Sequence, residues 1–138
     1  MFRQSIYRAV FVMVASAMLA SCATTPFEES PVSGNPAVIA LADTARSEIT
    51  RYRYPEAAAS LERALRIEPR NARLWHELAR VRLAQEDYSQ AENLAKRSNS
   101  YAADDNALRR ANWKVISECR RELGDLLGAE DALKKSKP

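Results

Sequence analysis

The 138-residue chain carries 21 lysines and arginines against 18 aspartates and glutamates, a formal net charge of +3. This near balance argues against a nucleic-acid-binding protein, and the length accommodates one modest domain. Only three glycines occur, whereas alanine, leucine, arginine and glutamate abound, which is typical of an all-α protein.

The first predicted element is a signal peptide over residues 1–21. Two arginines precede an apolar run from Ala9 to Ala20, and small residues follow it, which is the order of a secretory signal. The run ends in Leu19-Ala20-Ser21-Cys22, which resembles the lipobox of bacterial lipoproteins. The resemblance implies cleavage before Cys22, a diacylglycerol on its thiol and acylation of its amino group, for example with palmitate. This covalent lipid would anchor the mature protein.

Two other interpretations of this segment stay open. An uncleaved transmembrane anchor needs roughly 20 apolar residues, and the uncharged stretch reaches from Ala9 to Phe27. Its second half is polar or helix-breaking, which favours cleavage. The other alternative is an ordinary signal peptide with an incidental cysteine. In the lipoprotein interpretation, Ala23 follows the cysteine where many inner-membrane relatives have aspartate. The resemblance therefore implies the outer membrane, facing the periplasm, although it does not exclude the inner membrane.

Residues 22–36 are expected to form a tether behind the lipidated cysteine. Three prolines, one glycine and no apolar period occur between Ala23 and Pro36. This composition is typical of an extended, disordered linker that lifts a domain away from a membrane.

The remainder of the chain repeats itself. Tyr88-Ser-Gln-Ala91 matches the earlier Tyr54-Pro-Glu-Ala57, and Leu126-Leu-Gly-Ala129 follows at a slightly longer interval. Another shared pattern lies upstream of each copy: Leu41-x-x-Thr44-Ala45, Trp75-x-x-Leu78-Ala79 and Trp113-x-x-Ile116-Ser117. Pro69 ends the first unit. A tryptophan, a pair with a small residue, an alanine and a closing proline at a period of about 34 residues resemble the tetratricopeptide repeat family.

The resemblance implies a short all-α helical solenoid of three helix–turn–helix repeats, at about 37–70, 71–104 and 105–138. First helices are predicted at about 37–51, 71–85 and 105–123, and second helices at about 55–67, 88–101 and 126–136. Pro55 suits the first turn of its helix, Asp104 or Asp105 can cap the fifth, and Gly124 can end it. A plain helical bundle is the alternative, but it does not account for the recurring tryptophan and alanine positions.

Cys119 is expected to be a small buried residue rather than a disulfide partner. It follows Trp113 at the place where the second repeat has Val81. If Cys22 carries lipid, no intrachain disulfide can form.

No catalytic or metal-binding pattern is evident, and no cofactor is expected beyond the lipid on Cys22. His76 is the single histidine, and no Cys, His and carboxylate spacing resembles a metal site. The three glycines lie in a linker or in turns, so no phosphate-binding loop is present. The sequence therefore predicts a protein that is not an enzyme.

Solenoids of this kind bind partner segments on the concave surface formed by their first helices. Counting helical phase from the tryptophans predicts a partner-binding groove lined by Arg46, Arg73, His76, Arg80, Lys114 and Arg121. Such a surface suits an acidic segment or a free carboxylate of a protein partner. An ordinary solvated face with charges of both signs is the alternative.

The sequence thus predicts a membrane-anchored periplasmic adaptor for envelope assembly, in pilus, secretion or cell-wall machinery. The competing hypothesis is a self-associating structural module. It rests on the last helix, whose Leu126, Leu127 and Leu133 have no following helix to cover them and could pair two copies as a homodimer.

Overall fold

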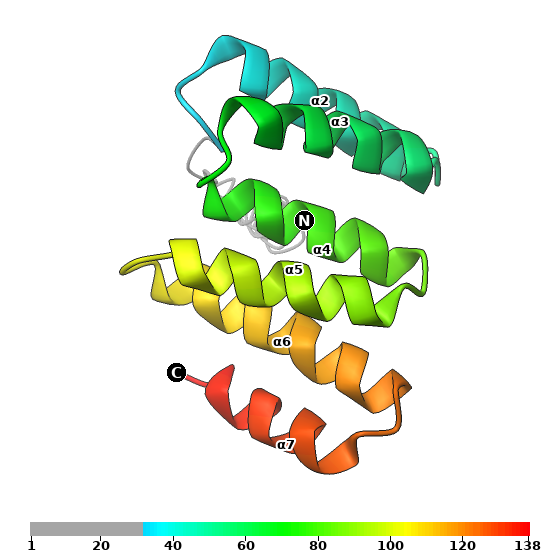
Figure 1. Cartoon of the computed structure of the whole chain (residues 1–138), viewed down its shortest axis with the longest axis vertical. Coiled ribbons are helices and arrows are strands. Elements are labelled where there is room, and N and C mark those ends of the chain that lie inside the picture. The colour runs from blue at the N-terminus through cyan, green and yellow to red at the C-terminus, as the bar shows by residue number, and fades with distance from the viewer. Residues whose placement is uncertain (1–31) are drawn as a thin grey trace, which may run out of the picture. The chain divides into compact units, whose positions relative to one another are not determined.

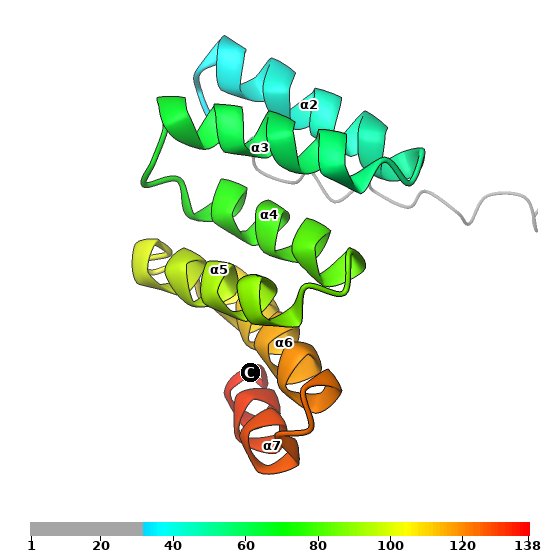
Figure 2. The ribbon, with the colours of Figure 1, turned by 45° about the vertical axis from the view of Figure 1, so that its right-hand side comes forward.

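The computed structural model describes residues 32–138, so the predicted signal peptide, the lipidation site Cys22 and most of the tether lie outside the described residues. Six helices follow one another in this part, and Figures 1 and 2 show them stacked as successive antiparallel pairs. They are α2 (Pro36–Thr50), α3 (Tyr54–Ile67), α4 (Ala72–Ala84), α5 (Tyr88–Tyr101), α6 (Asn106–Glu122) and α7 (Leu126–Lys135). No helix within residues 32–138 has the length and apolar character needed to cross a bilayer.

The observed boundaries agree closely with the predicted ones, because local signals determine them. Side chains of Asn35, Asn71, Asp87, Asp105 and Asp125 each accept a hydrogen bond from a backbone N–H in the first turn of the following helix. Pro55 lies in the first turn of α3, as predicted. Gly124 follows α6 with φ of 83°, a conformation that other residues rarely adopt.

The core consists of two clusters of buried residues, and each cluster contains side chains from more than one helix pair. One joins α2, α3 and α4 through Val38, Leu61 and Leu74, and the other joins α4 to α7 around Ile116. Fully buried alanines such as Ala57 separate the larger side chains, so the helix backbones can approach closely. Each pair therefore buries its apolar face against its neighbour, as expected for stacked repeats.

The residues directly before α2 contact the α3–α4 connection. The Nδ2 of Asn71 donates to the Val32 carbonyl at 2.8 Å, and the Ser33 hydroxyl donates to Glu68 Oε1 at 2.5 Å. These two hydrogen bonds hold the start of the domain against the junction between the first two repeats.

The third repeat differs from the second by one additional helical turn. Helix α6 has 17 residues and α4 has 13, and the tryptophan is the eighth residue of α6 but the fourth of α4. The insertion therefore lies at the start of α6 and leaves the phase of Trp113 unchanged.

The predicted burial of Cys119 is confirmed, with an exposed fraction of 0%. Burial raises the pKa of its thiol to about 11, and the nearby carboxylates of Glu92 and Glu118 add to the shift. A thiol in this environment is chemically inert.

Candidate partner-binding groove

The first helix of each repeat carries the predicted groove residues, and α4 and α6 are in direct contact. Between these two helices lies a hollow of about 440 Å³. It is lined by Arg80, Leu83 and Ala84 from α4 and by Lys114, Val115 and Glu118 from α6. The structure thus brings two predicted groove residues, Arg80 and Lys114, to one concave site with an apolar wall.

Two other predicted residues, Arg73 and His76, connect α4 to α6. Arg73 Nη2 lies 3.3 Å from Asp105 Oδ2, on the residue that caps α6. His76 Nδ1 lies 2.7 Å from Asn112 Oδ1. An amide oxygen only accepts, so this bond requires the proton on Nδ1. Both side chains hold the first helices of neighbouring repeats together.

Asn112 is a residue of this junction that the sequence analysis did not identify. It is fully buried, and its Nδ2 donates to Ser98 Oγ at 2.7 Å and to Asn99 Oδ1 at 3.0 Å. Asn112 directly precedes Trp113, just as the fully buried Leu74 directly precedes the tryptophan of the second repeat. The repeat phase was therefore a sufficient signal that this amide would be buried and would need hydrogen-bond partners.

Carboxylates accompany several of the predicted groove arginines. Arg46, on α2, lies 2.8 Å from Asp43, Arg80 lies 3.7 Å from Glu77, and Arg121 lies 3.4 Å from Glu122. These pairs lower the net positive charge of the surface. Arg46 and Arg121 do not line the hollow. Within residues 32–138, Lys114 forms no ion pair, so its ammonium remains available at the rim.

The described residues contain no cluster of three histidines, cysteines or carboxylates that could hold a metal ion. The residues that line the hollow offer charges, hydrogen bonds and apolar contacts.

Comparisons with known proteins agree with this architecture. A tetratricopeptide repeat family model matches residues 49–112. The globular C-terminal domain of P. aeruginosa LpoP is 42% identical, with a TM-score of 0.74, and the match covers 77% of this chain and 100% of that domain. No curated protein matches the chain.

Two further solved structures share the fold at lower identity. The N-terminal domain of stress-induced protein-1 from C. elegans is 14% identical with a TM-score of 0.68, covering 72% of this chain and 81% of that one. The Sgt2 TPR domain from Aspergillus fumigatus is 21% identical with a TM-score of 0.67, covering 76% and 67%. With its three stacked helix pairs and its 42% identity to the complete LpoP domain, the chain belongs to the tetratricopeptide repeat family.

Proposed function

We propose that the protein is a membrane-anchored periplasmic adaptor that binds a segment of a protein partner in the concave groove between α4 and α6. The observation that carries this proposal is the hollow that brings Arg80 and Lys114 together beside Leu83 and Val115. Tetratricopeptide domains are protein-interaction modules, and a groove with an apolar wall and a cationic rim suits an extended segment with apolar and acidic side chains.

The anchor is proposed from the residues Leu19–Cys22. A lipid on Cys22 would fix the domain at the outer membrane, and two or more acyl chains hold a protein stably in a bilayer. The LpoP domain, which is matched over its full length, is itself a globular C-terminal domain, which supports the arrangement of one folded domain behind a separate N-terminal segment. The setting that we propose is envelope assembly, in pilus, secretion or cell-wall machinery.

The experiment is crosslinking in intact cells, followed by membrane fractionation and recovery of the chain. The wild type should fractionate with the outer membrane and capture a defined envelope protein. The variant Cys22→Ala should lose both the membrane association and the partner. If Cys22→Ala stays membrane-bound, the segment is a transmembrane anchor and the proposed lipid is wrong.

A charge reversal tests the groove separately from the anchor. Arg80→Glu with Lys114→Glu should abolish capture, because both changes place a carboxylate where we propose that the acidic partner binds. The matched control is Arg63→Glu with Arg66→Glu, two exposed arginines of α3 that form no ion pair within residues 32–138. Equal capture by both double variants would refute the groove proposal.

A self-associating module is the second candidate, and one observation favours it. Leu123, Leu126, Leu127 and Leu133 are 51%, 67%, 84% and 48% exposed at the end of the solenoid. Adjacent exposed leucines of this kind mark interaction surfaces. Recovery of copies of the chain alone, abolished by Leu126→Ser with Leu127→Ser, would support this candidate over the adaptor.

A further inference from the structure

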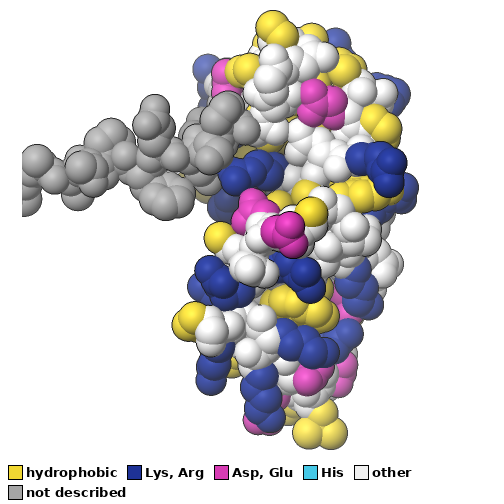
Figure 3. Space-filling view, turned by 90° about the vertical axis from the view of Figure 1, so that its left-hand side faces the viewer, with side chains coloured by type: hydrophobic (Ala, Val, Ile, Leu, Met, Phe, Trp, Pro, Cys, Tyr) yellow, Lys and Arg dark blue, Asp and Glu magenta, His cyan; other side chains and the backbone are white. Residues whose placement is uncertain are grey.

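A second, cationic pocket lies around Trp113, on a different face of α6 from the one that lines the hollow. It has a volume of about 500 Å³ and is lined by Asn106, Arg109, Arg110 and Trp113 from α6 and by Lys135 and Lys137 from the C-terminal part of the chain. Four cations and no carboxylate therefore surround one indole ring. Figure 3 views the side of the molecule at which α6 begins and α7 ends, and Lys and Arg side chains gather over the lower half of this face.

Part of this arrangement is a structural feature that recurs in the repeats. Lys135 Nζ lies 4.8 Å from the centre of the Trp113 ring, and Arg97 lies 4.4 Å from that of Trp75. In both repeats the cation follows its tryptophan at the same interval along the chain. The contact between a cation and the tryptophan ring is thus common to both repeats. The other residues of the pocket are the ones that differ between the two repeats.

The additional turn of α6 changes the surroundings of the indole. In the second repeat, Trp75 Nε1 donates to the Pro69 carbonyl at 2.8 Å. Ala103 holds the equivalent place before the capping residue of α6, and there Arg109 Nη1 approaches the carbonyl at 3.4 Å instead. Within residues 32–138, the indole N–H of Trp113 has no hydrogen-bond acceptor. The indole N–H of Trp113 is therefore available in the pocket, whereas the indole N–H of Trp75 is used in a hydrogen bond within the domain.

The other cations are also specific to the third repeat. When the two tryptophans are aligned, the second repeat has Ala72 and Asn99 at the positions of Arg110 and Lys137. Neither Arg110 nor Lys137 forms an ion pair with any residue of the described part of the chain. Lys135 is partly neutralised, since its Nζ lies 2.6 Å from Asp131 Oδ2. The uncompensated charge is thus concentrated at the residues that the second repeat lacks.

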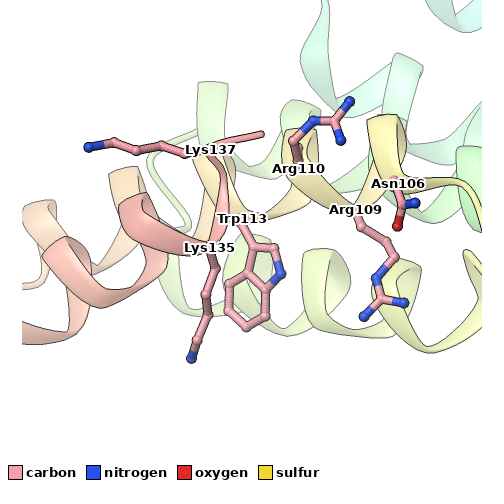
Figure 4. A pocket seen from close by; sticks show the side chains of 6 residues that line it. All are labelled: Asn106, Arg109, Arg110, Trp113, Lys135 and Lys137. Carbon is pink, nitrogen blue, oxygen red and sulfur yellow. The ribbon is translucent and has the colours of Figure 1, made fainter.

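Figure 4 shows how these donors are placed. Lys135 and Arg109 flank Trp113 and extend in the same direction, and the indole nitrogen lies on the side of Arg109. Arg110 and Lys137 lie above Trp113 in this view, and their charged groups extend away from the ring. A carboxylate between the indole N–H and the Arg109 guanidinium would accept charge-assisted hydrogen bonds, and the start of α6 adds a favourable helix dipole.

The geometry points to a second binding site, for an acidic segment of a protein partner, in which Trp113 and Arg109 bind one carboxylate and Arg110 and Lys137 bind further carboxylates of the same segment. A protein segment fits better than a lipid surface because the donors surround a recessed ring in a hollow. The strongly exposed Leu126 and Leu127, which could enter a bilayer, lie at the other end of α7 from Lys135 and Lys137. The site is independent of the groove proposed above.

The test measures fluorescence anisotropy of labelled peptides added to the purified full-length chain. The probes are C-terminally amidated hexaglutamate, amidated hexaglutamine, and hexaglutamine with a free carboxylate. Hexaglutamate should bind and amidated hexaglutamine should not. Binding of free-carboxylate hexaglutamine alone would also support the site and would assign the carboxylate to a chain terminus rather than to side chains.

The variants locate the site. Arg109→Glu with Lys137→Glu should weaken hexaglutamate binding by about tenfold or more, because two charged donors become repulsive. Trp113→Phe, which keeps a ring but removes the N–H, should weaken hexaglutamate binding several-fold. Thermal melting checks that each variant is folded. The charge-matched Arg63→Glu with Arg66→Glu should leave hexaglutamate binding within about twofold.

Equal loss in the charge-matched control would overturn the proposal, since binding would then reflect net charge alone. The proposal is also wrong if hexaglutamate binds no better than amidated hexaglutamine while phosphatidylglycerol vesicles bind the wild type and release the Arg109→Glu, Lys137→Glu variant. That result would assign the pocket to an anionic lipid surface.

Discussion

Replacement of Asn112 by alanine tests the buried polar junction that holds α4, α5 and α6 together. The side chain makes three hydrogen bonds, to His76, Ser98 and Asn99, and is 0% exposed. A hydrogen bond contributes about 1 kcal/mol net to stability, so the loss should be about 3 kcal/mol. No larger penalty is expected, because Ser98 keeps its bond to the Ala72 carbonyl at 2.8 Å and the other two partners are only partly buried.

The measurement is urea unfolding followed by far-UV circular dichroism, with Asn93→Ala as the matched control. Asn93 is exposed on α5, so both substitutions bring the same gain in helix propensity, about 0.7 kcal/mol at most. The difference between the two variants therefore isolates the buried network. A difference below about 1 kcal/mol would refute the reasoning that these hydrogen bonds stabilise the repeat junction.

A double-mutant cycle with His76→Ala then assigns part of the loss to one contact. Groups in direct contact show coupling energies of about 0.5–3 kcal/mol, and the 2.7 Å bond between His76 and Asn112 places this pair within that range. Additive losses would show that His76 does not depend on Asn112.

Three further predictions concern single residues. Cys119→Ala should remove a loss of stability at high pH. Because the pKa of the thiol rises from 9.0 to about 11 on folding, the thiol stabilises the fold below pH 9.0, and this contribution disappears as the pH rises through about 11. Urea midpoints of both proteins across this range measure the effect, and parallel curves would contradict it. Glu92→Gln should destabilise at neutral pH. Burial raises the pKa of Glu92, but hydrogen bonds and charges from Lys96 and Arg120 outweigh burial and hold the pKa below 4.5. The carboxylate therefore stabilises the fold above pH 4.5, and this stabilisation is lost as the pH falls through the lower pKa of the folded state. The difference in urea midpoint between the two proteins should shrink on acidification rather than stay constant. Gly124→Ala should lower the free energy of unfolding by about 1 kcal/mol, because alanine is strained at this positive φ. Thermal or urea unfolding measures the change. No neighbouring atom lies within 4 Å of the added Cβ, so an unchanged stability would show that the backbone accommodates alanine there.

The helices were predictable because their boundaries depend on neighbours in the sequence. Asp105 caps α6 through the N–H of Leu108, which lies in the same turn, and Pro55 and Gly124 act on the turn that contains them. The repeat period then identified which helix faces would be buried. The order, length and pairing of the helices are therefore determined by the amino-acid sequence alone.

The chemistry of the surfaces was less accessible to sequence reasoning. Helical phase placed Arg73, His76 and Arg80 on one face, but it could not show that Arg73 contacts Asp105 or that His76 contacts Asn112. These partners lie 32 and 36 residues away. Whether a charge on a helix face is available or neutralised depends on which side chain the neighbouring helix presents.

The pocket around Trp113 illustrates the same division. The sequence by itself determined three helix pairs, a third repeat longer by one turn and a tryptophan in unchanged phase. Only the tertiary structure decided that the additional turn separates the Ala103 carbonyl from the indole, and that Lys135 and Lys137 of the chain's end lie beside Arg109 and Arg110. Local hydrogen bonds and periodic burial act over a few residues, whereas a binding surface is assembled from side chains that packing brings together from distant parts of the chain.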